Sequence, residues 1–331
     1  MSKLKDTDYL YISARLRSLE NRLLNRERME RMLEARTDED AAKVLSECGY
    51  HGLEPLSLQT LEQSLAAARA EAFAELAAAA PDSRIVDIFR MKYDYHNAKA
   101  VIKCAAAGQD ATRLLIDAGR FSAERFLESA QRGDLSGLSD SLRLAMENAS
   151  DILAATGDPQ RCDFVLDRAY YAELSQTAAA SGSGFLQEYV RLMVDAANLR
   201  SAVRAMRMHK DLEFLNAVIM DGGSVSKAAI TAAAMAGGGL ESLFTGSLQT
   251  AAALGDAAVK GGRQTAFERA CDNALTDYMR TSRMVPFGDS VLAAYMAAKE
   301  NEITAARIIL SGRLSGLDTE TIRERLREAY V

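Results

Sequence analysis

Residues 93–103 read YDYHNAKAVIK, and residues 194–204 repeat that pattern as VDAANLRSAVR. The two stretches agree at the acid, at the asparagine, at both basic positions and at apolar positions. Asn97 and Asn198, which occupy the same place in the pattern, lie 101 residues apart. Self-similarity at a fixed period indicates a repeated structural unit, so this pair of stretches determines the expected organisation of the chain.

A second motif follows each copy at nearly the same spacing. Residues 119–122 read GRFS and residues 223–226 read GSVS, which is an offset of 104 residues. A third, more diverged copy begins at KENEITAAR, residues 299–307, where Glu302 takes the place of the asparagine. GRLS at residues 312–315 then echoes the glycine motif. Units of about a hundred residues have a typical domain size, so we expect three related domains with boundaries 1–115, 116–220 and 221–331.

The composition predicts that these domains are helical. Hydrophobic residues make up 48% of the chain and charged residues 26%, tryptophan is absent, and prolines number only four in 331 residues. Long proline-poor, alanine-rich segments favour helix because strong helix formers meet nothing that breaks them. An apolar stripe predicts a first helix from Tyr9 to about Ala35, and Thr37 with Asp40 marks the start of a second. The predicted fold class is all-α.

Charge and cysteine usage exclude several classes of function. The formal net charge of −6 and the pI near 5.4 disfavour a general nucleic-acid binder, which needs a basic surface. The four cysteines are far apart and form no Cys-x-x-Cys pair, so we expect reduced thiols and no zinc site. No run approaches the ~20 apolar residues of a membrane span. We therefore expect a cytoplasmic protein that reaches a membrane only by docking onto something already there.

Motifs for catalysis or cofactor binding are also missing. No glycine run is followed by the Lys-Ser/Thr pair of a phosphate-binding loop. Ser224 and Lys227 match a Ser-x-x-Lys nucleophile motif, but its companion motifs are absent. The three histidines are scattered, and Asp94 with His96 would diverge on a helix because residues two apart do not share a face. We expect no catalytic residue, no cofactor and no metal.

The repeated stretches carry a polar pattern with two interpretations. Asp94, Asn97 and Val101 fall on one helical face, from which the acid and the amide can bond to another helix. Lys99 and Lys103 place like charges four residues apart, as Arg200 and Arg204 do, and such pairs need an anionic neighbour. That neighbour is either a set of carboxylates on adjacent helices, including Asp94, Asp195 or Glu300, or the acidic surface of a partner. The candidate structural or partner-binding positions are Asp94, Asn97, Lys99, Lys103, Asp195, Asn198, Arg200, Arg204, Lys299, Glu300, Glu302 and Arg307.

At these stretches the chain resembles the C subunit of the bacterial and archaeal V/A-type ATPases, a family that includes the d subunit of the eukaryotic vacuolar enzyme. The resemblance covers the full length. It also includes YLYISARLR at residues 9–17, KENE at 299–302 with RIILSG at 307–312, and RERLREAYV at 323–331.

The resemblance implies three similar helical domains in a pseudo-threefold arrangement that forms a funnel. Such a subunit is not an enzyme. It is a central-stalk adaptor that links the central-shaft subunits to the membrane rotor ring and transmits torque for ATP-coupled proton or sodium transport. The alternative that the residues leave open is a helical-repeat scaffold unrelated to rotary ATPases, which would share the composition and the repeats.

Overall fold

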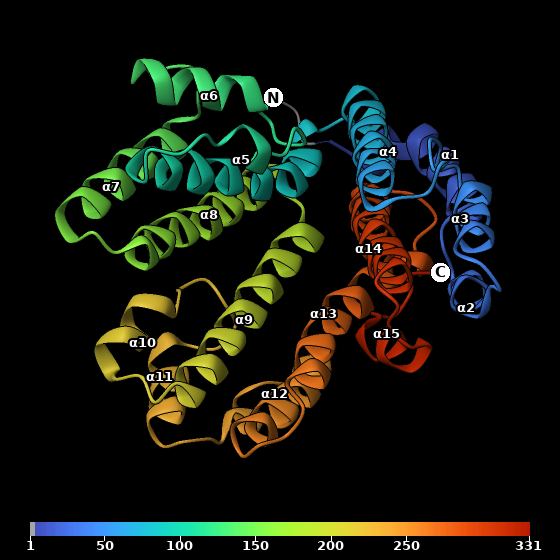
Figure 1. The fold of residues 1–331 in the computed structure, drawn as a ribbon. Coiled ribbons are helices and arrows are strands. Elements are labelled where there is room, and N and C mark those ends of the chain that lie inside the picture. Colours follow the sequence, from blue (N-terminus) through green and yellow to red (C-terminus); the bar gives the residue numbers. More distant parts are fainter. Residues whose placement is uncertain (1–3) are drawn as a thin grey trace. The chain divides into compact units, whose positions relative to one another are not determined.

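The computed structural model describes residues 4–331, and every regular element in that range is a helix (Figure 1). The prediction of an all-α fold is therefore confirmed. The chain packs as two compact units. Unit 1 contains residues 4–81 together with Arg191–Val331, and unit 2 contains Asp82–Val190. The division into domains 1–115, 116–220 and 221–331 stays a prediction.

Unit 1 begins with η1 (Asp6–Tyr9), α1 (Leu10–Glu20), α2 (Arg26–Glu34), α3 (Asp38–Glu47) and α4 (Leu58–Ala79). The prediction of a single helix from Tyr9 to Ala35 is wrong, because the helix is interrupted between Glu20, where α1 ends, and Arg26, where α2 begins. Asn25 caps α2 by accepting the backbone N–H of Arg28 at 2.9 Å, and capping side chains of this kind favour a new helix start over continuation. Thr37 caps α3 by accepting the N–H of Asp40, as predicted.

The remaining elements of unit 1 follow the long helix α9 (Gly184–Arg207), which begins in unit 2 and crosses the boundary between the units. They are α10 (Leu212–Val218), α11 (Lys227–Met235), η3 (Leu240–Leu243), α12 (Gly246–Val259), α13 (Gln264–Arg280), η4 (Thr281–Met284), α14 (Asp289–Leu314) and α15 (Thr319–Arg325).

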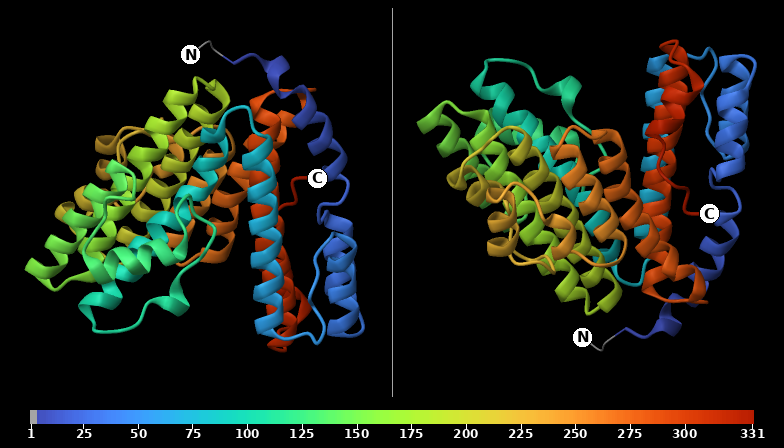
Figure 2. Two further views of the ribbon diagram at one scale, coloured as in Figure 1. Left: turned by 90° about the horizontal axis from the view of Figure 1, so that it is seen from above. Right: turned by 90° about the horizontal axis from the view of Figure 1, so that it is seen from below.

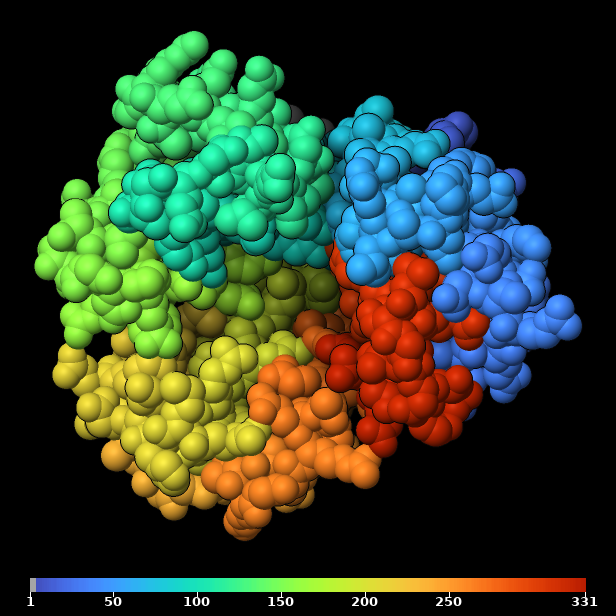
Figure 3. Space-filling model, in the orientation of Figure 1, coloured from blue at the N-terminus to red at the C-terminus, as the bar shows by residue number. Residues whose placement is uncertain are grey.

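The helix α14 holds the two ends of the chain together. It packs against α1, α2, α3 and α4 as well as α13 and α15. Figure 2 shows α4 and α14 side by side in both views, and the adjoining blue and red surfaces of Figure 3 are these N-terminal and C-terminal segments. A hydrophobic cluster joins Leu33, Leu45 and Leu65 of the N-terminal helices to Ile303 and Ile309 of α14. Burial of this apolar surface stabilises the pairing of two segments that lie far apart in the chain.

A second hydrophobic cluster of unit 1 lies among α9 to α13. It includes Leu199 and Val203 of α9 with Phe267 and Cys271 of α13. Gly255 lets α12 approach α9 closely, because a Cβ at this position would lie 2.8 Å from Cγ2 of Val203 on α9. Two of the four cysteines, Cys48 and Cys271, lie in these clusters, and all four are buried free thiols. Burial raises the pKa of Cys48 to about 11.

Unit 2 is built on α5 (Ser83–Ala106), η2 (Thr112–Leu114), α6 (Ala123–Arg132), α7 (Asp140–Thr156) and α8 (Pro159–Ser181). Asp82 caps α5 by accepting the N–H of Arg84. The three long helices α5, α7 and α8 pack on one another around Phe126, Leu142 and Leu166. None of the helices in residues 4–331 has the length and apolar character needed to cross a membrane.

Candidate functional site

Asn97 and Asn198 occupy equivalent positions on α5 and α9, and each holds the backbone of the loop that follows its helix. Asn97 Nδ2 donates to the carbonyl of Ile116 at 2.9 Å, and its Oδ1 accepts the N–H of the same residue at 2.9 Å. Asn198 makes the same pair of bonds with Met220, both at 2.8 Å. Both asparagine side chains are fully buried. A side-chain amide that satisfies one buried N–H and one buried C=O replaces the pairing that a helix or sheet would provide.

Asp94 and Asp195, one turn earlier on the same helices, bind the second motif. Asp94 Oδ1 accepts the N–H of Phe121 at 3.3 Å, and Asp195 accepts the N–H of Ser224 at 2.9 and 3.0 Å. The sequence predicted bonds from this face to another helix, but the partners are loop residues.

The repeated glycines explain why the loops reach these acids. A Cβ at Gly119 would lie 2.1 Å from Asp94 Oδ1, and one at Gly223 would lie 2.1 Å from Asp195 Oδ1. Only glycine permits that approach without displacing the carboxylate. The third echo differs, because Gly312 lies inside α14 and a Cβ there would meet Ile322. The glycine motif therefore serves the same purpose twice and not three times.

Glu302 holds a distant part of the chain in the third copy. Its Oε2 accepts the backbone N–H of Leu24 at 2.6 Å, and its Oε1 accepts the hydroxyl of Tyr50 at 2.6 Å. Lys299, one turn earlier on α14, donates to Oε1 at 2.6 Å and lies over the Tyr50 ring. Only 3% of Glu302 is exposed, so the ammonium group and the hydrogen bonds compensate a buried charge. Burial, followed by the charge of Glu302, raises the pKa of Tyr50, so its hydroxyl stays a donor.

Asp94 is part of a buried charge network in unit 2. Arg120 Nε donates to Asp94 Oδ2 at 2.6 Å, and Arg120 Nη1 donates to Glu173 of α8 at 2.8 Å. Glu173 also accepts the hydroxyl of Tyr95 at 2.8 Å and that of Ser139 at 3.1 Å. Burial raises the pKa of Asp94, and the guanidinium of Arg120 opposes this shift. Neither Glu173 nor Arg120 was a sequence candidate, although Arg120 lies within the glycine motif.

The cations of the repeated pattern meet carboxylates on neighbouring helices. Lys99 and Lys103 donate to Asp167 at 2.5 Å and to Asp163 at 2.9 Å, and both acids lie on α8. The two lysines, with His96, line an open cavity of about 630 Å³ in unit 2. The ion pairs supply the anionic neighbours that the sequence required, but these are not Asp94, Asp195 or Glu300.

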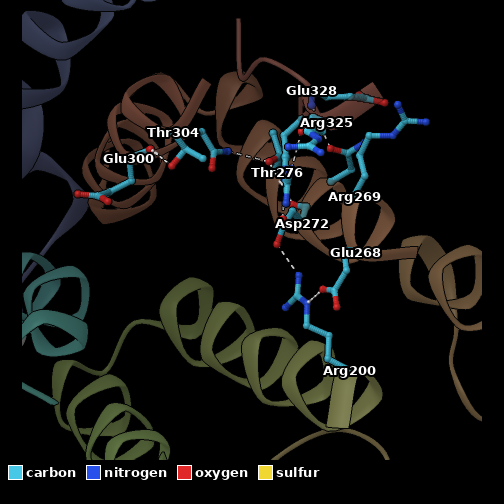
Figure 4. A network of polar contacts seen from close by, with 12 residues as sticks. Arg200, Glu268, Arg269, Asp272, Thr276, Glu300, Thr304, Arg325 and Glu328 are labelled. Carbon is cyan, nitrogen blue, oxygen red and sulfur yellow. Dashed lines mark hydrogen bonds and ion pairs between the residues drawn. The ribbon is translucent and has the colours of Figure 1, made fainter. Parts of the chain in front are cut away.

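Arg200 makes the corresponding contacts in unit 1, as Figure 4 shows. Its guanidinium donates to Glu268 at 2.8 Å and also to Asp272, and both acids lie on α13. Asp272 Oδ2 accepts a second guanidinium, that of Arg327, at 2.7 Å, so the C-terminal segment joins the same network. Arg204 is exposed and forms no ion pair with any residue in the range 4–331.

The third copy pairs with α4. Glu300 binds Arg69 at 3.1 Å, and Arg307 binds Glu62 through two bonds of 2.6 and 2.9 Å. A further contact that the sequence did not reveal is that of Arg313, which donates to Asp38 and to the carbonyls of Leu33 and Ala35. Its only signal was its place in the GRLS stretch, residues 312–315, which echoes the glycine motif.

These arrangements bind backbone and neutralise charge, and they offer no constellation for catalysis. His96 Nε2 lies 2.9 Å from the carbonyl of Leu114, which makes this nitrogen a hydrogen-bond donor to a loop rather than a base beside a nucleophile. The carboxylates of the network are already bonded to arginine, lysine or backbone N–H groups. The site is therefore a set of structural clamps, which hold loops and chain segments on long helices.

Replacing a clamp asparagine tests its structural importance. Asn198→Ala leaves the buried N–H and C=O of Met220 without partners, and Asn97→Ala does the same to the partly buried N–H and C=O of Ile116; each buried group costs about 1–3 kcal/mol. We expect either variant to lower the urea midpoint of unfolding, by an amount equivalent to about 2–4 kcal/mol. Asn148→Ala is the matched control, because Asn148 is exposed on α7. Midpoints that coincide with that of the control would contradict the clamp.

Replacing Arg120 tests the charge network as a function of pH. We expect Arg120→Met to raise the pKa of Asp94 further, because the opposing guanidinium is lost, and carboxyl-carbon NMR would measure it. A folded-state pKa above the unfolded value of about 3.9 means that stability falls as pH rises through the folded pKa.

The thermal midpoint of Arg120→Met should therefore fall further below that of the unmodified chain at pH 7 than at pH 4. Arg161→Met, at an arginine 58% exposed on α8, serves as the control. An Asp94 pKa that is unchanged or lowered in Arg120→Met would refute the network.

Comparison with known proteins identifies the family to which this chain is similar. The family model for the ATP synthase (C/AC39) subunit matches residues 12–325. The C subunit of the V-type sodium ATPase of Enterococcus hirae is 24% identical over 98% of this chain and 99% of that protein. The C subunit of the A-type ATP synthase of Methanocaldococcus jannaschii is 24% identical over 96% of this chain and 86% of that protein. That of Haloferax volcanii is 29% identical over 74% of this chain and 75% of that protein.

The family match spans nearly the whole chain and includes all three copies of the repeated pattern. It removes the alternative of a scaffold unrelated to rotary ATPases. The chain belongs to the ATP synthase (C/AC39) subunit family, and it is a structural subunit of a V/A-type rotary ATPase that is not itself catalytic.

Proposed function

We propose that this chain is the central-stalk adaptor of its rotary ATPase, which links the central-shaft subunits to the membrane rotor ring. In this role it turns with the rotor and transmits torque for ATP-coupled proton or sodium transport. Family membership supports a subunit of the complex. The observation that carries the finer proposal is that buried polar clamps on α5, α9 and α14 fix loops and distant segments at defined positions.

Torque transmission requires stiffness, which the packed interior and the clamps both provide. Close-packed interiors transmit strain with little compression. In unit 1, Glu302 and Arg313 of α14 also bond the backbone near Leu24 and Leu33, so the N-terminal helices cannot slide along α14 without breaking buried bonds. A subunit that only filled space would not need charged groups in its core, where they are costly unless paired.

We propose further that three related domains are built around the long helices. The repeated clamps and the separate hydrophobic clusters on α5, α9 and α14 support this arrangement. In this proposal α1 to α4 would complete the third domain, because these helices supply the partners of α14, and this differs from the sequence-based division that places residues 1–115 in the first domain. A pseudo-threefold funnel with these domains as its wall would suit a shaft that enters one end and a ring that supports the other.

The location and the site residues follow from the same proposal. The chain would lie on the cytoplasmic side, held at the membrane by the rest of the complex. Most of the repeated polar positions would serve the interior of the subunit, because their partners are intramolecular. Arg204 is exposed without an ion pair in the described range and is the member of the set best suited to contact an acidic partner surface.

A reconstituted complex tests the adaptor role. The complex would be assembled in vesicles with and without this chain, and ATP hydrolysis and ion transport would be measured together. We expect omission to leave hydrolysis by the catalytic head intact and to abolish ion transport, because no part would couple the shaft to the ring. Addition of the purified chain should restore transport. Full transport in its absence would contradict the adaptor role.

A further inference from the structure

A second cavity of about 630 Å³ opens in unit 2, between α5, α6 and α7 (Figure 1). Both α6 and α7 pack on α5, but these two helices make few contacts with each other. They therefore leave a hollow between them over the C-terminal half of α5. Its volume falls within the range of about 300–1,000 Å³ that is typical of small-molecule sites.

The lining of this cavity is mainly aliphatic. Its buried part includes Val101 and Ile102 of α5 and Met146 and Leu153 of α7. Most of the other lining residues are exposed alanines and glycines. The lining residues all fall within residues 101–157, and none of them is charged or aromatic. Apolar cavities bind apolar molecules, and without an aromatic ring this one offers no surface for stacking.

The charges nearest to the cavity are already neutralised. It adjoins the cavity that contains Lys99 and Lys103, and the two cavities share Leu153. Both lysines donate to acids of α8, which are Asp167 and Asp163. A charged ligand would therefore lose its hydration without gaining a counter-charge, which is costly. The cavity favours a neutral ligand.

One buried hydroxyl in the lining has no hydrogen-bond partner. Ser129 and Phe126 form the buried face of α6, and Ser129 is only 2% exposed. Its Oγ bonds to no atom of residues 4–331. By contrast, the hydroxyls of Ser46 and Ser175 each donate to the carbonyl one turn earlier on their own helices.

The unpartnered hydroxyl costs stability that alanine would not cost. A buried polar group without a hydrogen bond is unfavourable, and an alanine at position 129 would fit the same helix. Ser64 and Thr231 share this condition, and what argues for a ligand at Ser129 is the cavity that this residue lines. A hydroxyl can donate one hydrogen bond and accept others, so it suits a ligand oxygen that is either a hydroxyl or a carbonyl.

We propose that this cavity binds a neutral, mainly aliphatic molecule that carries one hydroxyl or carbonyl oxygen, which bonds to Ser129 Oγ. The aliphatic part would lie against Val101, Met146 and Leu153, where its burial is favourable. Such a ligand would bridge α6 and α7. The inference goes beyond the proposed adaptor function and does not depend on it.

Titration of the full chain with 1-octanol tests the site. We expect 1-octanol to shift the methyl NMR signal of Met146, and octanoate or octylammonium, which carry a charge, to leave it in place. Ala154→Leu should abolish the shift, because Ala154 is an exposed lining residue of α7 and a larger side chain there would occupy the cavity. Ala155→Leu is the matched control, since Ala155 is exposed on α7 and is not part of the lining.

Replacing Ser129 distinguishes a ligand-binding hydroxyl from a structural one. Ser129→Ala removes a hydroxyl without a partner in the described chain, so we expect its thermal midpoint without ligand to equal or exceed that of the unmodified chain. The same variant should bind 1-octanol about fivefold more weakly, which corresponds to the loss of one neutral hydrogen bond. A lower midpoint with unchanged 1-octanol binding would show that the hydroxyl is structural and would overturn its assignment.

Two sources of ligand share this chemistry, a free molecule and the acyl chains and ester carbonyls of a membrane lipid. Perturbation of the Met146 signal by phosphatidylcholine vesicles as well as by 1-octanol would identify lipid as the source, and perturbation by 1-octanol alone would identify a free molecule. If 1-octanol causes no shift, or if octanoate causes an equal one, the proposal is wrong. Neither result would affect the adaptor function, which the reconstituted complex tests separately.

Discussion

The structure depends on one kind of interaction, the hydrogen bonds from a buried polar side chain of a long helix to the backbone of another segment. Asn97 and Asn198 satisfy both backbone groups of one loop residue, and Glu302 satisfies the N–H of Leu24. A buried backbone group without a partner is costly, so each loop has one favourable position on its helix. The clamps therefore convert long helices, which could otherwise pack in several registers, into units with a defined shape.

The charged residues around the clamps extend this constraint to neighbouring helices. The ion pairs of Lys99 and Lys103 join α5 to α8, and those of Arg200 join α9 to α13. Each exposed ion pair of this kind contributes little to stability, but several pairs in one network can hold the joined helices in one relative orientation. In unit 1 the C-terminal segment shares Asp272 with α9, so the end of the chain helps to hold the long helix. The adaptor role that we propose would require such cross-links, because it depends on stiffness.

Much of the fold could be predicted from the sequence, because helix formation is local. The proline-poor composition indicated helix, and capping residues such as Thr37 indicated where helices begin. The interruption between α1 and α2 was missed because the apolar stripe by itself carries no stop signal. In the structure the cap by Asn25 and the tertiary bond from Leu24 to Glu302 explain why a separate helix begins at Arg26. The repeat identified Asp94, Asn97 and their counterparts, but it could not identify their partners. Those partners lie in loops or on helices distant in sequence, and their identity depends on packing.

Asn97, Asn198 and Glu302 each hold a backbone N–H that lies outside the helices and would otherwise open readily. Native-state amide hydrogen exchange measures this directly, since exchange requires the N–H bond to open. We predict that the amides of Ile116, Met220 and Leu24 exchange as slowly as those in the buried middle of α5, α9 and α14, although all three lie outside helices. Exchange of these three amides at the rate of an unstructured peptide would contradict it.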